Sequence, residues 1–84
     1  MEKWDDILKS DIKFRYQLLD RLIGDCVYYL GFGNRHKKYL WSQSEEEQIE
    51  IMKLLWSSFS DADKPEWTTL DEINSYEKQI LANM

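Results

Sequence analysis

Few side chains in this chain of 84 residues carry the chemistry that catalysis or metal binding needs. The only histidine, His36, lies in a basic run whose cations disfavour its protonated form, so it is poorly suited to act as a general base. The only cysteine, Cys26, falls on an apolar helical stripe, where a free cysteine is usually a small core residue. A metal site needs several converging ligands. The sequence therefore predicts a protein that is not an enzyme and that binds no metal and no cofactor.

A basic and aromatic run, which we call the basic segment, is the first candidate binding site. Positive charge beside an aromatic ring is typical of surfaces that bind single-stranded nucleic acid. However, the run contains few permanent charges, and the acidic residues that follow it would repel a polyanion. We therefore expect it to contact a protein encoded by the host or by the same genetic element. The basic segment consists of Asn34, Arg35, His36, Lys37, Lys38 and Tyr39.

An acidic run, Glu45, Glu46 and Glu47 followed by Glu50, is the alternative candidate surface. Its place at a predicted helix start favours ionised carboxylates, which argues against paired acid and base catalysis. Glu45, Glu46 and Glu50 leave open a second hypothesis, an anti-defence inhibitor that mimics nucleic acid and blocks a restriction or CRISPR enzyme. A weak accessory role in nucleic-acid binding is a third.

The charge is unevenly distributed along the chain. Residues 11–43 contain six basic and three acidic side chains, whereas residues 44–84 contain three basic and ten acidic ones, within a net charge of −5. Such a division permits self-association, or binding of a charged partner.

Length and composition indicate a single domain over residues 1–84. No apolar run approaches the roughly 20 residues that a membrane span needs. The N-terminus lacks the apolar stretch of a secretory signal, and one cysteine forms no internal disulfide, so we expect a cytoplasmic protein.

The longest predicted element is a helix over residues 11–30, with Ser10 as its N-cap. Its interior Gly24 is unfavourable in a helix, and we attribute it to the close approach of another element. We expect the helix to stop at a corner where at least one of Gly31, Gly33 or Asn34 has a positive φ. The apolar stripe of this helix consists of Ile12, Tyr16, Leu19, Ile23, Cys26 and Leu30, widened by Leu18, Leu22, Val27 and Tyr29.

Two further helices are predicted over residues 44–59 and 69–82. Each begins with a capping box, Ser44 with Glu47 and Thr69 with Glu72. Their stripes are Ile49, Met52, Leu55, Trp56 and Phe59 in the first, and Leu70, Ile73, Tyr76 and Ile80 in the second.

Each connection between helices carries a tryptophan shortly before the next cap, Trp41 in one and Trp67 in the other. We expect both rings to be mostly buried, as in a hydrophobic staple. A pairing of residues 39–41 with residues 66–68 as a minimal two-stranded ribbon is left open, because both segments are too short for the sequence to decide it. The predicted fold is thus mainly α, a compact three-helix domain with Trp41, Trp56 and Trp67 in or beside the core.

The sequence around these elements resembles the large polyvalent protein-associated domain family, class eleven, over residues 15–80. The parts that carry the resemblance are Gly31, Gly33, Asn34 and Arg35, then Leu40-Trp41, Glu47-Gln48, and Lys64-Pro65-Glu66-Trp67. The resemblance implies a small domain found in phages and conjugative elements, alone or fused to large multi-domain proteins, and it implies no known catalysis. Folding explains most of the matching residues. Asn34 and Arg35 are the exceptions, which makes them candidates for a contact surface; for Asn34 the alternative is that it supplies a left-handed residue at the corner.

Overall fold

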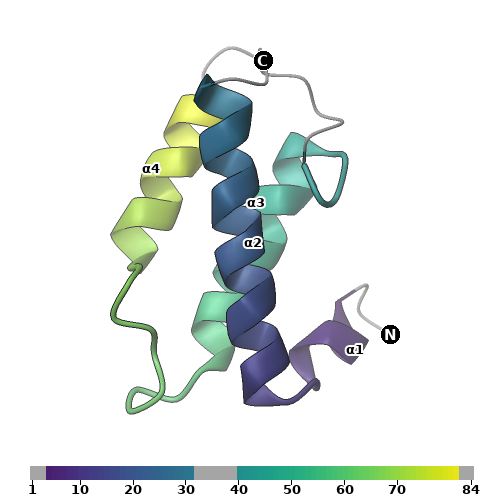
Figure 1. Cartoon of the computed structure of the whole chain (residues 1–84), viewed down its shortest axis with the longest axis vertical. Helices are drawn as coiled ribbons and strands as arrows, with labels where there is room; N and C mark the ends of the chain where they lie inside the picture. The colour runs from purple at the N-terminus through teal and green to yellow at the C-terminus, as the bar shows by residue number, and fades with distance from the viewer. Residues whose placement is uncertain (1–3, 32–39, 82–84) are drawn as a thin grey trace.

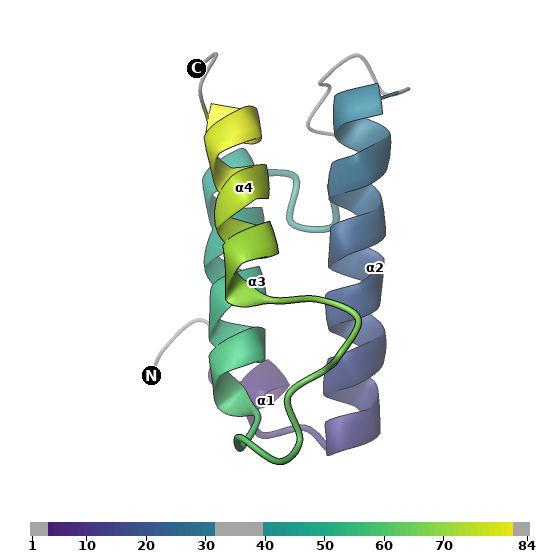
Figure 2. The same ribbon diagram turned by 90° about the vertical axis from the view of Figure 1, so that its left-hand side faces the viewer.

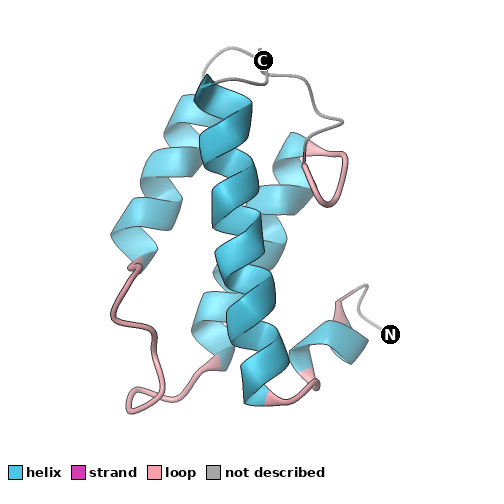
Figure 3. Cartoon of the chain, viewed as in Figure 1, coloured by secondary structure: helices cyan, strands magenta, loops and turns pink. Residues whose placement is uncertain are grey.

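The computed structural model describes residues 4–31 and 40–81, and these residues are mainly helical (Figure 1). In chain order the helices are α1 (Asp5–Leu8), α2 (Ile12–Gly31), α3 (Glu45–Ser58) and α4 (Leu70–Leu81). The prediction of a mainly α fold is confirmed, with the short α1 as an addition to the three predicted helices. The described residues contain no strand (Figure 3), and residues 40–41 and 66–68 form turns, bends and irregular backbone instead of a ribbon.

The helices form two layers (Figure 2). α3 and α4 pack against each other in one layer, and α2 packs on both of them from the other side. α1 packs against α3 near the start of α2 (Figure 1). One side of α2 is therefore buried against two helices, while none of the other helices covers its opposite side.

The apolar core lies between the two layers. The predicted stripes supply most of it, but Ile12 is 37% exposed and Val27 is 52% exposed, so the buried side of α2 is narrower than its sequence pattern indicates. Ile51, outside the predicted stripe of α3, is fully buried, because α3 contacts α1, α2 and α4. The fully buried apolar side chains are Leu19, Leu22, Cys26, Ile51, Met52, Leu55, Ile73 and Ile80.

Side-chain caps define where the three long helices begin. Ser44 Oγ accepts a hydrogen bond from the Glu47 backbone N–H at 3.3 Å, and Thr69 Oγ1 accepts one from the Glu72 N–H at 3.2 Å, as predicted. The prediction for α2 is wrong by one residue. Asp11 Oδ1 accepts from the Phe14 N–H at 2.8 Å, whereas Ser10 Oγ donates to the carbonyl of Asp6 in α1.

α2 ends at Gly31, at the corner where the helix was expected to stop. Gly31 does not have a positive φ; Gly33 and Asn34 lie outside the described residues, so the expectation that at least one of the three is left-handed stays a prediction. Among the described residues a positive φ occurs at Gln43, 59°, in the turn before α3. A Cβ on Gly24 would meet nothing within 4 Å, so the explanation by close approach of another element is wrong.

The burial of the tryptophans also differs from the prediction. Trp67 is 48% exposed, so the expectation that its ring is buried is wrong. A hydrophobic staple uses the residue directly before the cap, which here is Thr68, and it is Thr68 that is buried, at 1% exposure. Trp41 is partly buried and lies 6.0 Å from Trp4, between ring centres. Trp4 itself is buried, which the sequence pattern did not indicate.

Candidate functional site

The basic segment, residues 34–39, lies outside the described residues, and its role in binding stays a prediction. The structure shows how the chain is held on either side of it. Before it, Tyr29 donates its hydroxyl hydrogen to Glu45 Oε2 at 2.9 Å, joining the end of α2 to the start of α3. After it, the backbone N–H of Trp41 donates to Asp25 Oδ2 at 3.0 Å, and Leu40 is buried. Both flanks are therefore fixed to the helical body.

A buried glutamine strengthens this junction. Gln48 is fully buried; its Nε2 donates to the Leu22 carbonyl at 3.2 Å and its Oε1 accepts from the Ser42 N–H at 3.1 Å. The amide thus ties α2 and the turn before α3 to α3 itself. Gln48 was not among the predicted functional or core residues, although its position four before Met52 places it on the same helical stripe.

The three residues of the predicted acidic surface, Glu45, Glu46 and Glu50, lie in two different environments. Glu45 accepts the hydrogen bond from Tyr29 and belongs to the junction just described. Glu46 and Glu50 line a groove between α3 and α4 with a volume of about 360 Å³. Lys53, in the same groove, forms an ion pair with Glu77 at 2.8 Å. The acidic run is therefore a helix start beside a small groove of mixed charge, and its three candidate carboxylates do not share one environment.

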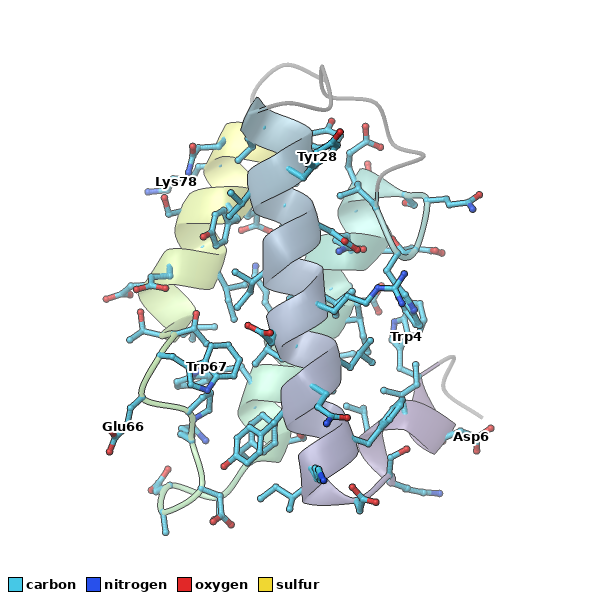
Figure 4. All side chains as sticks on the ribbon, in the orientation of Figure 1. Trp4, Asp6, Tyr28, Glu66, Trp67 and Lys78 are labelled. Atoms are coloured by element: carbon cyan, nitrogen blue, oxygen red, sulfur yellow. The ribbon has the colours of Figure 1, made fainter. Side chains whose placement is uncertain are left out.

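The connection between α3 and α4 presents a surface that we did not predict as a site. Trp67 is exposed there, on the α4 side of α2, as Figure 4 shows. The backbone around it is fastened: Pro65 and Thr68 are buried, and Tyr16 donates its hydroxyl hydrogen to the carbonyl of Asp63. Lys64 Nζ donates to the Phe59 carbonyl at 2.6 Å. The indole is thus displayed to solvent from a loop that packing and hydrogen bonds hold in place.

Cys26 has the environment of a core residue. Its thiol is fully buried, 3.6 Å from the sulfur of Met52, and burial together with the nearby charge of Asp25 raises its pKa to about 12. A thiol in this setting remains protonated near neutral pH and is a poor nucleophile. Within residues 4–31 and 40–81 no group of histidine, cysteine and carboxylate side chains could hold a metal ion. None of the helices in those ranges is long and apolar enough to cross a membrane.

The model of one protein family, Large polyvalent protein-associated domain 11, matches residues 12–80. The chain belongs to this family. The matched range runs from the first residue of α2 almost to the end of α4. It therefore includes the basic segment, the buried Gln48 and the connection between α3 and α4 that carries Trp67. No curated protein and no solved structure matches the chain. Membership assigns the chain to the domains associated with large polyvalent proteins, as the resemblance at residues 31–35 and 64–67 implied.

Proposed function

We propose that this domain is a non-enzymatic protein-interaction module of a mobile genetic element, and that its partner is a protein of the host or of the element. The observation that carries the proposal is the exposed indole of Trp67, on a loop whose backbone is held by buried neighbours and hydrogen bonds. Tryptophan is enriched among the residues that dominate binding energy in protein interfaces, because its ring buries a large area at little entropic cost.

The way in which Trp67 is held supports this role. A residue that is ordered before binding loses less conformational freedom when the complex forms. Pro65 and Thr68, on either side of Trp67, are both buried, so the ring is presented without a large rearrangement of the backbone. The inaccessible thiol of Cys26 supports a function that does not depend on nucleophilic chemistry.

Site-directed photo-cross-linking tests the proposal in cells that carry the element. A photoreactive phenylalanine analogue replaces Trp67 in one variant and Gln17, on the exposed side of α2, in a matched control. We expect a protein adduct from position 67 that is absent or much weaker from position 17. Equal adducts from both positions, or none from position 67, would contradict the proposal.

The basic segment is a second contact of the proposed module. Reversing the charges of Arg35, Lys37 and Lys38 together is expected to reduce the adduct formed at position 67 while the far-ultraviolet circular dichroism spectrum stays unchanged, as surface substitutions usually leave folding intact. An unchanged adduct yield would restrict the interface to the Trp67 loop.

A further inference from the structure

The uncovered side of α2 has a pattern that repeats every seven residues. α2 forms one layer by itself, and none of the other described helices lies on that side (Figure 2). Between residues 13 and 31, every exposed residue falls into one of three columns along the helix. A seven-residue spacing keeps each column on one face of a helix, as in a coiled coil. The central column is Gln17, Gly24 and Gly31, and the flanking columns are Lys13, Asp20 and Val27 on one side and Phe14, Arg21 and Tyr28 on the other.

The flanking columns carry apolar and charged side chains that the fold leaves largely in solvent. Phe14, Val27 and Tyr28 are 45%, 52% and 44% exposed. Several large apolar side chains exposed on one side of a helix are typical of a protein contact surface. Asp20 and Arg21 are also exposed, and within the described part of the chain no hydrogen bond or ion pair engages either of them. This side of α2 therefore offers a partner both apolar area and charges of both signs.

The central column also has no explanation within the fold. A Cβ built on Gly24 or on Gly31 would meet nothing within 4 Å. Glycine is unfavourable in the interior of a helix, but it allows another backbone to approach closely. A second helix that lay along this side of α2 would make its closest approach at Gly24.

We propose that the uncovered side of α2 binds the same side of α2 in a second copy of this chain, with the two helices parallel about a two-fold axis. In such a pair each flanking column faces the other flanking column of the second copy, as the e and g positions do in a parallel coiled coil. Asp20 of each copy then faces Arg21 of the other, so two ion pairs form. Val27 of each copy faces the ring of Tyr28 of the other. The surface is therefore complementary to itself in both charge and apolar character.

The charges also determine the direction of the pair. In an antiparallel pair of the same overlap, each flanking column faces itself, which places Asp20 near Asp20 and Arg21 near Arg21. Like charges placed opposite each other oppose binding. In the parallel pair Lys13 instead faces the ring of Phe14, which attracts a cation. The parallel pair is therefore the arrangement in which the exposed residues of all three columns fit one another.

Sedimentation equilibrium of the full chain tests whether the pair forms. The helices would meet over residues 13–28, about 24 Å, which buries less than the roughly 1,200 Å² of total area that a stable interface needs. We therefore expect a weak pair with a dissociation constant of about 0.1 mM, at about 0.15 M ionic strength. Between about 0.02 mM and about 1 mM the average mass should rise from that of one chain toward that of two. A chain that is still monomeric at about 1 mM would overturn the inference.

Charge reversals on α2 test which residues face each other. Asp20→Arg places arginine opposite arginine, and Arg21→Asp places aspartate opposite aspartate, so each is expected to weaken the pair by about tenfold. The variant with both substitutions keeps the net charge and restores both ion pairs in the reverse sense, so it should stay within about twofold of the parent. An equimolar mixture of the two single variants should pair as well. If the variant with both substitutions is as weak as the single ones, Asp20 does not face Arg21 and the parallel pair is wrong.

Two reversals on α4 control for the overall charge of the protein. Asp71→Arg and Lys78→Asp change the net charge by the same amounts at exposed positions outside the surface of α2. Each is expected to change the dissociation constant by less than about twofold. Losses as large as those at positions 20 and 21 would show that net charge alone governs the association, and would overturn the inference.

Cysteine cross-linking tests the register of the pair. Gln17, in the central column, faces Gln17 of the second copy, so Gln17→Cys should form a disulfide between copies under mild oxidation. Asp71→Cys, on α4, should do so much more slowly. The native thiol of Cys26 does not interfere, because it is fully buried. Equal rates at positions 17 and 71 would overturn the inference.

This inference does not depend on the proposed function, and the two are judged by different products. In the photo-cross-linking experiment, an adduct of two copies of this chain at position 17 belongs to the pair of α2 helices. The proposed function is judged by adducts that contain a different protein. A monomeric chain that forms such an adduct at position 67 would overturn the pair and leave the interaction module standing.

Discussion

The buried amide of Gln48 gives a prediction whose size follows from its two hydrogen bonds. Gln48→Ala removes the bonds to the Leu22 carbonyl and the Ser42 N–H. Each contributes about 0.5–1.5 kcal/mol, and an amide N–H left without a partner costs about 1–3 kcal/mol. The higher helix propensity of alanine offsets only a few tenths of this. We therefore expect the free energy of unfolding to fall by about 2–4 kcal/mol.

Urea unfolding followed by circular dichroism measures this loss. A domain of this length has a total stability of about 4–13 kcal/mol, so the variant is expected to unfold at a clearly lower midpoint, and in thermal unfolding its Tm should drop by about 10–25 °C. Gln17→Ala, at an exposed position of α2, serves as the control and should stay within about 0.5 kcal/mol of the parent. A loss below about 0.5 kcal/mol for Gln48→Ala would refute the view that this amide holds the junction together.

Three further predictions follow from burial. Trp4→Ala should lower the free energy of unfolding by about 3–5 kcal/mol, whereas Trp67→Ala, at a half-exposed ring, should cost at most about half as much, both measured by urea unfolding; similar losses would contradict the assigned burial. Gly24→Ala, with open space around the new methyl group, should raise stability by about 0.5–1 kcal/mol, and any loss would show that the glycine is needed. The raised pKa of Cys26, about 12 against its ordinary 9.0, favours the folded state, a contribution that is complete below pH 9.0 and declines as pH rises toward 12. Alkylation of the Cys26 thiol at pH 8 should accordingly occur only as fast as the protein unfolds, and rapid labelling of the folded protein would disprove its burial.

The parts of the fold that were predicted correctly depend on local signals. Ser44 and Thr69 stand three residues before a glutamate, and both act as N-caps, because a cap needs only a few neighbouring backbone groups to form. The short α1 gave no such signal. It has four residues, too few for an apolar period, and Trp4 at its start is buried against Trp41 from a distant part of the chain.

The candidate surface was harder to predict because burial depends on tertiary contacts. Trp67 and Thr68 are adjacent, and the local sequence does not indicate which of the two is buried. The contacts of Lys64 were not visible in the sequence, since its Nζ donates to the Phe59 carbonyl, lies over the Trp56 ring and pairs with Asp61.

The hydrogen bonds that flank residues 32–39 have a consequence for how the domain can change. Tyr29 with Glu45, and Asp25 with Trp41, hold the two ends of this stretch to the helical body without using any residue inside it. Lengthening a connection between fixed ends is inexpensive, because each doubling of its length costs only about 0.6 kcal/mol in chain entropy. New sequence can therefore be introduced between Gly31 and Leu40 at little cost to the stability of the helices, so this connection is expected to tolerate insertions.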